Sequence, residues 1–293
     1  MDLWKARIVA IEAAEAAGTL LRRGACGRFD VREKGAADVV TSLDIESERV
    51  IVERIRAGYP RHRIISEELG VVDGDDAWSW VIDPLDGTNN LAIGLPVYGI
   101  GLALCHEGVP MLGVIHDPVS DRTWSAIRGR GAWMSRNRAL LRSADRRRRR
   151  PLLAWSQGYA VSPDDPMASA LRILLERMAG RVLQLWAPLT YWVMLARGDI
   201  DGIVGYRIGE VDLHAGVVIA REVGIDIRDL SGAPFEERLG DMSETRSLVA
   251  GPADVVDRLL RLGPPAERLR TRLTDLWTAE RAVAHTPEQP DWR

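Results

Sequence analysis

One segment decides the fold, and it reads Trp80-Val81-Ile82-Asp83-Pro84-Leu85-Asp86-Gly87-Thr88-Asn89-Asn90. Three apolar residues lead into two carboxylates, a proline and a Gly-Thr pair. This order predicts a buried strand that ends in a tight turn before a short helix. Asp83 and Asp86 are three residues apart, so their side chains can converge on one small volume. Because Mg²⁺ prefers carboxylate oxygens, the turn is a candidate metal site.

The same turn is also a candidate anion site. Gly87 allows the backbone to approach a ligand closely, and the main-chain amides of Gly87, Thr88 and Asn89 are free at a helix start. Those amides carry partial positive charge, so a phosphate bound there could share its oxygens with ions on the two aspartates. The alternative for an isolated Asp-x-x-Asp is an ordinary turn that caps a helix, because aspartate is common in turns.

Composition limits the classes of protein to which the chain can belong. Its 293 residues are 46% apolar, which is enough for a large core in one domain or two. The formal net charge of -3 gives no field that attracts nucleic acid, and no run of about 18 apolar residues could span a bilayer. Glu12 and Glu15 interrupt the segment where a signal peptide would be apolar, so we expect a cytoplasmic protein. With only Cys26 and Cys105, a disulfide framework and a thiolate zinc site are excluded.

The N-terminal part is expected to hold two helices and a mostly antiparallel sheet. Apolar spacing and turn residues predict helices over 3–23 and 44–57, and strands over 28–32, 64–65, 97–104, 110–116, 122–127 and 131–134. In the second helix we expect Ile45 to face the core and Glu48 to face solvent. Glu67 follows a predicted strand, which aims it at the carboxyl end of a sheet, although adjacent acids more often lie in a solvated loop.

The C-terminal part alternates strands and helices, as an α/β layer does. The predicted elements cover 152–155, 166–180, 182–186, 189–197, 202–206, 211–222 and 266–284. Asp212 lies at or near the first turn of one of these helices, where it could be a simple cap. The run Arg146 to Arg150 could bind polyanions but more often forms an exposed connector. We therefore expect an N-terminal α+β half with the metal motif over 1–145, a C-terminal α/β half over 151–262, and a helical extension and tail over 263–293.

Four segments closely resemble the inositol monophosphatase family in their order and spacing. They are Ala37-Asp38-Val39-Val40-Thr41-Ser42-Leu43-Asp44, Ser66-Glu67-Glu68, the segment 80–88, and Val211-Asp212-Leu213-His214-Ala215-Gly216. The resemblance covers residues 5–260, and four motifs together are far more specific than one. It implies an α/β (α+β) sugar-phosphatase fold layered α/β/α/β/α. It also implies a Mg²⁺-dependent phosphomonoesterase of a small phosphorylated metabolite, inhibited by lithium and often a homodimer.

The resemblance also implies which residues hold two metal ions. By motif position, Glu67, Asp83 and the carbonyl of Leu85 would hold the first ion. Asp83, Asp86 and Asp212 would hold the second, so that Asp83 bridges the pair. Three aspartates gathered in one pocket repel one another unless cations neutralise them, which fits this role.

The catalytic residues that the resemblance implies are Glu67, Thr88 and Asp44. Glu67 and Thr88 would position the attacking water, and Asp44 would accept a hydrogen bond from the Thr88 hydroxyl. The amides of Gly87 and Thr88 would bind phosphate. Two metal ions favour an in-line attack by water, with no covalent intermediate on the enzyme.

The chain departs from the family pattern on the substrate side. Val211 and His214 replace a usual tryptophan and a usual small residue beside the metal aspartate. Gly205 stands where inositol-specific members have a substrate-binding glutamate, and the segment Trp186-Ala187-Pro188 replaces a small Gly-Ser/Thr-Ala loop. We therefore expect a substrate other than inositol phosphate, either bulkier or with another anion near Arg207, in contact with Trp186 and Pro188.

Other classes of function place different requirements on the sequence. A phosphatase with an aspartyl nucleophile needs an Asp-x-Asp pair, and Asp83 and Asp86 are one residue too far apart. A nucleotide-type or amino-alcohol phosphate could be the substrate, or the protein could be a binding or regulatory member that has lost turnover. Nucleotide kinases and serine hydrolases are excluded, because the sequence has neither a Gly-Lys pair nor a G-x-S-x-G pentapeptide.

Overall fold

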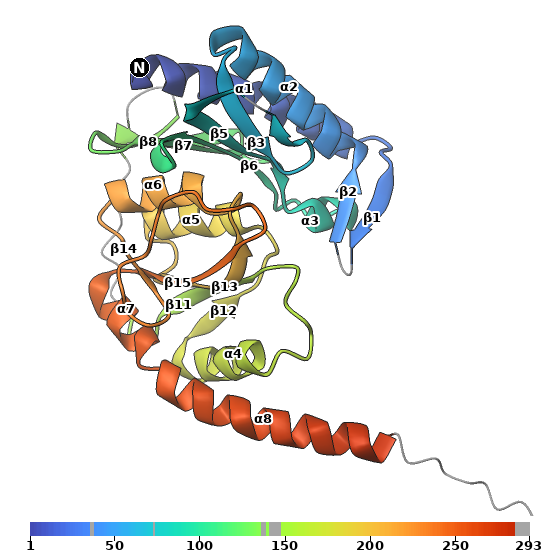
Figure 1. The fold of residues 1–293 in the computed structure, drawn as a ribbon, viewed down its shortest axis with the longest axis vertical. Coiled ribbons are helices and arrows are strands. Elements are labelled where there is room, and N and C mark those ends of the chain that lie inside the picture. Colours follow the sequence, from blue (N-terminus) through green and yellow to red (C-terminus); the bar gives the residue numbers. More distant parts are fainter. Residues whose placement is uncertain (36–37, 73, 136–138, 141–147, 285–293) are drawn as a thin grey trace, which may run out of the picture.

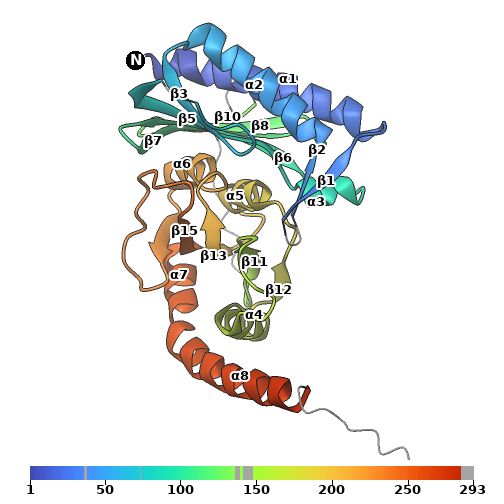
Figure 2. The ribbon, with the colours of Figure 1, turned by 45° about the vertical axis from the view of Figure 1, so that its right-hand side comes forward.

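The computed structural model describes residues 1–35, 38–72, 74–135, 139–140 and 148–284. Its helices are α1 (Leu3–Ala25), α2 (Ser42–Gly58), α3 (Thr88–Ala92), α4 (Pro166–Met178), α5 (Pro188–Arg197), α6 (His214–Glu222), α7 (Ala253–Leu260) and α8 (Gly263–Ala284). The elements are layered α/β/α/β/α, which confirms the expected fold (Figure 1). Helices α1 and α2 form one outer layer, α5 and α6 lie between two sheets, and α4 and α7 cover the far side (Figure 2).

The first sheet carries the decisive segment in its interior. Its strand order is β10-β9-β8-β7-β6-β5-β3-β4, with β3 and β5 parallel and the other pairs antiparallel. The expected meander is therefore present. The bounds are β3 (His62–Ser66), β4 (Gly70–Val72), β5 (Asp75–Asp86), β6 (Gly99–His106), β7 (Val109–Asp117), β8 (Arg122–Ile127), β9 (Gly131–Met134) and β10 (Ala139–Leu140).

Helices α1 and α2 cover the outer face of this sheet. The alanines of α1 pack closely because they need little room, and Asp2 caps the helix by accepting hydrogen bonds from two main-chain amides. Thr41 and Asp44 form a capping box at the start of α2. The prediction for the faces of α2 was wrong at two positions: Ile45 is 55% exposed, whereas Glu48 is only 2% exposed. Glu48 is buried because it has hydrogen-bond partners on the turn after β3.

Strands β1 (Val31–Gly35) and β2 (Asp38–Thr41) form a separate antiparallel hairpin beside α3 (Figure 1). The first strand was expected over 28–32 and in fact begins three residues later. Its five residues are all exposed, so no apolar alternation marked its ends. The hairpin carries Lys34 towards the end of β3.

The second sheet has the order β12-β11-β13-β15-β14. Its strands are β11 (Leu152–Gln157), β12 (Arg181–Leu183), β13 (Gly202–Gly209), β14 (Asp226–Asp229) and β15 (Thr245–Gly251). Strands β11, β12 and β13 run parallel, as the alternation of strands and helices indicated. Strands β14 and β15 and helix α7 were not predicted. Of the arginine run, Arg146 and Arg147 lie outside the described residues, and Arg148 pairs with Asp201 at 2.8 Å.

Three clusters of buried side chains fill the spaces between the layers. One lies between α1, α2 and the first sheet, one surrounds α5 and α6, and one lies between the second sheet and α4, α7 and α8. Ala266 of α8 is fully buried in the third cluster, although much of that helix is exposed. In the described ranges, no helix is long and apolar enough to cross a bilayer.

Candidate active site

A cavity of about 200 Å³ lies where strand ends of both sheets meet. Its walls come from the last residues of β5, β11 and β13, from the turns after β3, β5 and β11, and from the segments that precede α5 and α6. Every site residue that the sequence predicted lines this cavity, except Asp44, which lies behind Thr88. These lining residues are Glu67, Asp83, Leu85, Asp86, Gly87, Thr88, Trp186, Pro188, Arg207 and Asp212.

Three aspartates from distant parts of the chain meet in the cavity. Asp83, Asp86 and Asp212 each offer a carboxylate oxygen, and these oxygens lie within 4.8 Å of one another. The first two belong to the end of β5, where the pairing with β6 is irregular between Asp83 and Asp86. Asp86 also accepts a hydrogen bond from the amide of Leu189 at 2.8 Å, so one carboxylate joins the β5 turn to the start of α5.

The acids of the cavity are buried and lie close together. Burial and the carboxylates of neighbouring acids raise the pKa values of Asp83 and Asp86 well above their usual range. Burial, helped by Asp38, raises the pKa of Asp212 to about 7. Burial also raises the pKa of Glu67 to about 7, although the charge of Lys34 opposes this rise. A divalent cation removes such repulsion, so the donor set fits a metal ion.

Glu67 lies on the same cavity but outside the cluster of three aspartates. The ammonium group of Lys34 pairs with Glu67 at 3.2 Å and with Glu68 at 2.7 Å. Burial lowers the pKa of Lys34, but the charges and hydrogen bonds of these two glutamates raise it above its usual value. Sequence reasoning missed Lys34, since a lysine in an exposed hairpin gives no signal of a partner 33 residues away.

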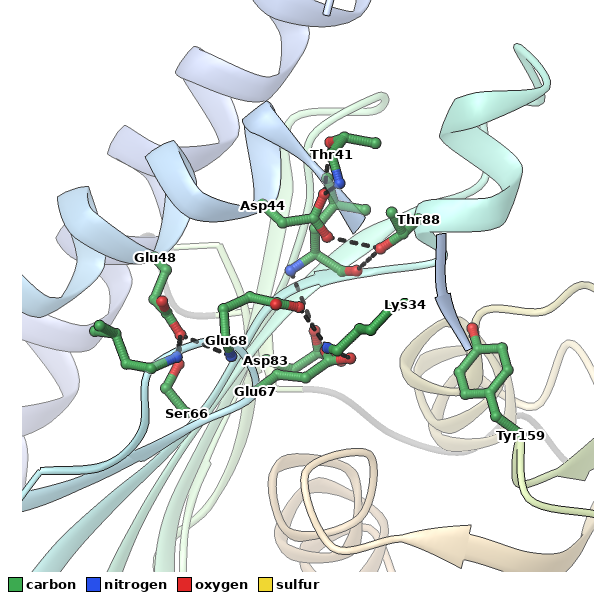
Figure 3. Close-up of polar contacts among 12 residues, drawn as sticks. Lys34, Thr41, Asp44, Glu48, Ser66, Glu67, Glu68, Asp83, Thr88 and Tyr159 are labelled. Carbon is green, nitrogen blue, oxygen red and sulfur yellow. Dashed lines mark hydrogen bonds and ion pairs between the residues drawn. The ribbon is translucent and has the colours of Figure 1, made fainter. Parts of the chain in front are cut away.

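Glu48 organises the turn that carries Glu67. Its Oε1 atom accepts hydrogen bonds from the amides of Glu68 and Leu69, both at 3.1 Å, and from the hydroxyl of Ser66 (Figure 3). A carboxylate buried with three donors is well satisfied, which explains why α2 turns this charged residue inward.

Thr88 and Asp44 lie next to the aspartates. The Thr88 hydroxyl is 2.7 Å from Oδ1 of Asp44 and 2.9 Å from the carbonyl oxygen of Leu85 (Figure 3). The other Asp44 oxygen accepts from the amide of Thr41 at 2.9 Å. Gly87 has φ 90°, and a Cβ there would lie 2.8 Å from the Val97 carbonyl oxygen, so the turn requires glycine.

The substrate side of the cavity comes mainly from the C-terminal part of the chain. Trp186, Pro188 and Arg207 line it, together with residues that were not predicted as site residues: Asp38, Trp155, Ser156, Gln157, Gly158, Tyr159, Ala160, Gln184, Tyr191, Gly209, Val211 and Thr245. Gln157 is the last residue of β11 and Tyr159 lies in the loop after it; no motif marks either residue, and both reach the cavity through the arrangement of the second sheet. Gly205 is not among the lining residues.

His214, which departs from the family pattern, lies in a buried ionic network behind Asp212. Its Nε2 atom is 2.8 Å from Oε2 of Glu210, and the other oxygen of Glu210 pairs with Arg246. Burial raises the pKa of Glu210, but hydrogen bonds from His214 and Arg246 outweigh it and lower the pKa below its usual value. The network supports the start of α6 and does not line the cavity.

Comparisons with known proteins agree with this geometry. A sequence model described as "Inositol monophosphatase family" matches residues 2–261. The chain is 33% identical over 228 residues to Nus factor SuhB of Pasteurella multocida, across 76% of this chain and 85% of that protein. It is 29% identical over 235 residues to inositol monophosphatase 1 of Solanum lycopersicum, across 78% and 85%. The solved structure of an inositol monophosphatase from Anabaena has a TM-score of 0.75 and 28% identity, across 89% of this chain and 96% of that one. This chain therefore belongs to the inositol monophosphatase family.

Proposed function

We propose that this protein is a Mg²⁺-dependent phosphomonoesterase that hydrolyses a small sugar, polyol or related metabolite monophosphate. The observation that carries the proposal is the cluster of Asp83, Asp86 and Asp212 within 4.8 Å, in a cavity that Thr88 also lines. Family membership supports the reaction class. As in much of the family, we propose a cytoplasmic homodimer.

The acids fit the role of metal ligands. Asp83, Asp86 and Asp212 would hold one Mg²⁺, and Glu67, Asp83 and the carbonyl of Leu85 would hold another. When bound, such ions lower the pKa of water and stabilise negative charge on the leaving oxygen. The carboxylates supply the negative charge that keeps the ions in place.

The remaining residues orient the reactants. Asp44 accepts a hydrogen bond from the Thr88 hydroxyl at 2.7 Å, which leaves a lone pair of that hydroxyl to accept a hydrogen bond from the attacking water. Glu67 would accept a hydrogen bond from the other O–H of the same water. The amides of Gly87 and Thr88 would bind the phosphate, because the left-handed glycine keeps that part of the turn free of side-chain atoms.

The size of the cavity favours a small substrate. At about 200 Å³ it is below the range of roughly 300–1,000 Å³ that is usual for sites of drug-sized ligands. This supports a small metabolite over a nucleotide-type phosphate. The bulky Trp186 in the cavity wall supports a substrate other than inositol phosphate.

A regulatory role without turnover is the second candidate, because several relatives at 31–33% identity are named Nus factor SuhB. The expectation of no nucleic-acid partner stays a prediction for this reason. The full set of acids with Thr88 and Asp44 favours turnover, since a binding protein has no need of a hydroxyl oriented beside a metal site.

A phosphate-release screen tests the proposal. Purified protein is incubated with Mg²⁺ or with a chelator and with sugar, polyol, amino-alcohol and nucleotide monophosphates, beside an Asp83→Asn variant. We expect Mg²⁺-dependent release from a small monoester and none from the variant. Release from no monoester at any Mg²⁺ concentration would contradict the proposal and favour the regulatory role.

A further inference from the structure

Two cavity residues have a backbone conformation that L-amino acids rarely adopt. The described non-glycine residues with positive φ are Glu107, Asp121, Ser135, Trp186 and Arg207. The first three lie just after strands of the first sheet, in the turns that follow β6, β7 and β9. Trp186 and Arg207 instead line the cavity, with φ of 51° and 50°. Strain of this kind is kept where the position of a side chain matters.

Arg207 lies in a β-bulge at the end of β13. In the pairing with β15, Tyr206 and Arg207 lie opposite the single residue Ser247, and the Arg207 amide donates to the Ser247 hydroxyl at 3.0 Å. A bulge of this kind turns a side chain away from the direction that regular pairing would give it. Here it turns an arginine to the wall of the cavity.

The loop after β11 packs directly against this bulge. A Cβ at Gly158 would lie only 2.0 Å from the carbonyl oxygen of Arg207, so the loop can approach only because residue 158 is glycine. Gln157, Tyr159 and Arg207 therefore form one continuous part of the cavity wall.

The guanidinium group of Arg207 is only loosely neutralised. Its nearest acid, Asp165, lies 4.0 Å away, and the Arg207 side chain is 49% exposed. Asp165 already accepts hydrogen bonds from the amides of Met167 and Ala168, each at 2.9 Å, and caps α4 in this way. Among the described residues that line the cavity, Arg207 carries the single positive charge.

We infer that Arg207 binds a second negative charge on the substrate, a carboxylate or a second phosphate, while the phosphate to be cleaved lies at the aspartates. The inference rests on the proposed function and adds the substrate class: a small phosphomonoester with another anionic group. A guanidinium group matches the two oxygens of such a group, whereas a neutral polyol gives it no charge to pair with. Arg207 is thus a specificity-determining residue.

The test compares pairs of substrates that differ in one negatively charged group. One pair is glycerol 3-phosphate and 3-phosphoglycerate, which adds a carboxylate; the other is fructose 6-phosphate and fructose 1,6-bisphosphate, which adds a phosphate. Values of kcat and KM are measured at saturating Mg²⁺ for the wild type, Arg207→Gln, and Arg172→Gln as the control, because Arg172 is exposed on α4 and does not line the cavity.

We expect the wild type and the control to prefer the more anionic member of at least one pair by about tenfold in kcat/KM, as one charged hydrogen-bond pair can provide. A preference in the first pair identifies a carboxylate as the bound group, and a preference in the second pair identifies a phosphate. Arg207→Gln should lose the preference through a KM for the more anionic member that rises far more than the KM for the member with a single phosphate. No preference in the wild type, or an equal loss on both members in the variant, would overturn the inference.

Two further measurements separate this inference from its premises. Arg207→Gly relaxes the positive φ, so it should be at least as thermostable as the wild type and still lack the preference, which excludes misfolding as the cause. If the wild type hydrolyses none of the four esters nor 4-nitrophenyl phosphate, the proposed function fails. In that case the binding of the same pairs is measured by the rise in melting temperature that each ester causes. If both members of each pair raise the melting temperature of the wild type equally, Arg207 does not bind a second anionic group.

Discussion

Glu48 illustrates how one buried residue can govern a site that it does not line. Its Oε1 atom holds the amides of Glu68 and Leu69, and thus fixes the direction of the preceding residue, Glu67. We expect Glu48→Ala to raise the Mg²⁺ concentration for half-maximal activity roughly tenfold, as loss of a supporting contact to a metal ligand usually does.

Glu48→Gln supplies the matched comparison. Glutamine retains an oxygen that can accept all three hydrogen bonds, so its Mg²⁺ dependence should stay within about threefold of the wild type. Glu46→Ala, on the exposed face of α2, should behave as the wild type. Equal Mg²⁺ dependence in all four proteins would show that Glu48 does not position Glu67.

The titration of the cavity acids gives a second prediction at the residue scale. Glu67 and Asp212 have pKa values of about 7 in the folded protein, above their values of about 4 in an unfolded chain. The folded state then binds more protons, so the stability that these groups contribute is complete below about pH 4 and is lost as pH rises through about 7. In chelator, the melting temperature should therefore fall between about pH 5 and pH 8.

Mg²⁺ should raise the melting temperature more at the upper end of that range, because it binds the deprotonated acids. Asp86→Asn removes one of the repelling charges and should flatten the fall in chelator, whereas Glu46→Gln should not. The measurement is a thermal melt at each pH with and without Mg²⁺. A parallel fall in the wild type and in Asp86→Asn would contradict the assigned repulsion.

At the scale of elements, the contact between α5 and α6 links packing to the cluster of Asp83, Asp86 and Asp212. A Cβ at Gly216 would lie 2.1 Å from the ring of Trp192, and the indole N–H of Trp192 donates to the carbonyl oxygen of Asp212 at 3.2 Å. Gly216→Ala should therefore destabilise the fold by about 1–3 kcal/mol, as overpacking does, and also weaken Mg²⁺ binding.

Trp192→Phe helps to separate the two effects, because it keeps an aromatic ring in the contact and removes the hydrogen bond to Asp212, while the buried volume that it also removes is reported by the stability measurement. Denaturant unfolding gives the stability, and the Mg²⁺ dependence of the melting temperature gives the ion binding. If Gly216→Ala changes neither quantity, the close packing of α6 on Trp192 has no role in holding Asp212.

Elements with strong local signals could be predicted from the sequence, and the others depended on tertiary contacts. The alternation over 122–127 gave the observed bounds of β8, whereas the apolar run that begins at Trp80 gave only the inner part of β5, which begins at Asp75. Strand β14 reads Asp-Ile-Arg-Asp, which has one apolar residue, and pairs only because β15 lies beside it. Glu48 was assigned to the wrong face because helical periodicity treats every glutamate as solvated.

The residues of the site also divide into those that the sequence predicts and those that depend on tertiary structure. Motif positions brought Asp83, Asp86 and Asp212 to one cavity correctly, since each follows or precedes a recognisable element. The loop of Gln157 and Tyr159 escaped notice, because its residues face the cavity through the arrangement of the second sheet. The division of the chain into domains at 145 and 262 stays a prediction.

For the whole molecule, α8 lies beyond the family match, which ends at residue 261. It packs on α4 and buries Ala266, with Leu269 and Leu273 partly buried in the same cluster. Deletion of residues 263–293 should lower stability on the order of 2 kcal/mol through lost apolar burial, yet leave Mg²⁺-dependent phosphate release within about twofold of the full chain. Melting curves and the release assay check both, and a loss of activity without unfolding would make α8 part of the catalytic unit.

The cavity has walls from both sheets, and each sheet contributes a different set of residues. Glu67, Asp83 and Thr88 come from the first sheet and its turns, whereas Trp186 and Arg207 belong to the second half of the chain. Apart from Asp212, the residues proposed for the reaction and those proposed for the choice of substrate are thus encoded in separate stretches of the gene. Descendants of such a protein could acquire new substrates by altering the later stretch alone, with the hydrolytic apparatus inherited intact.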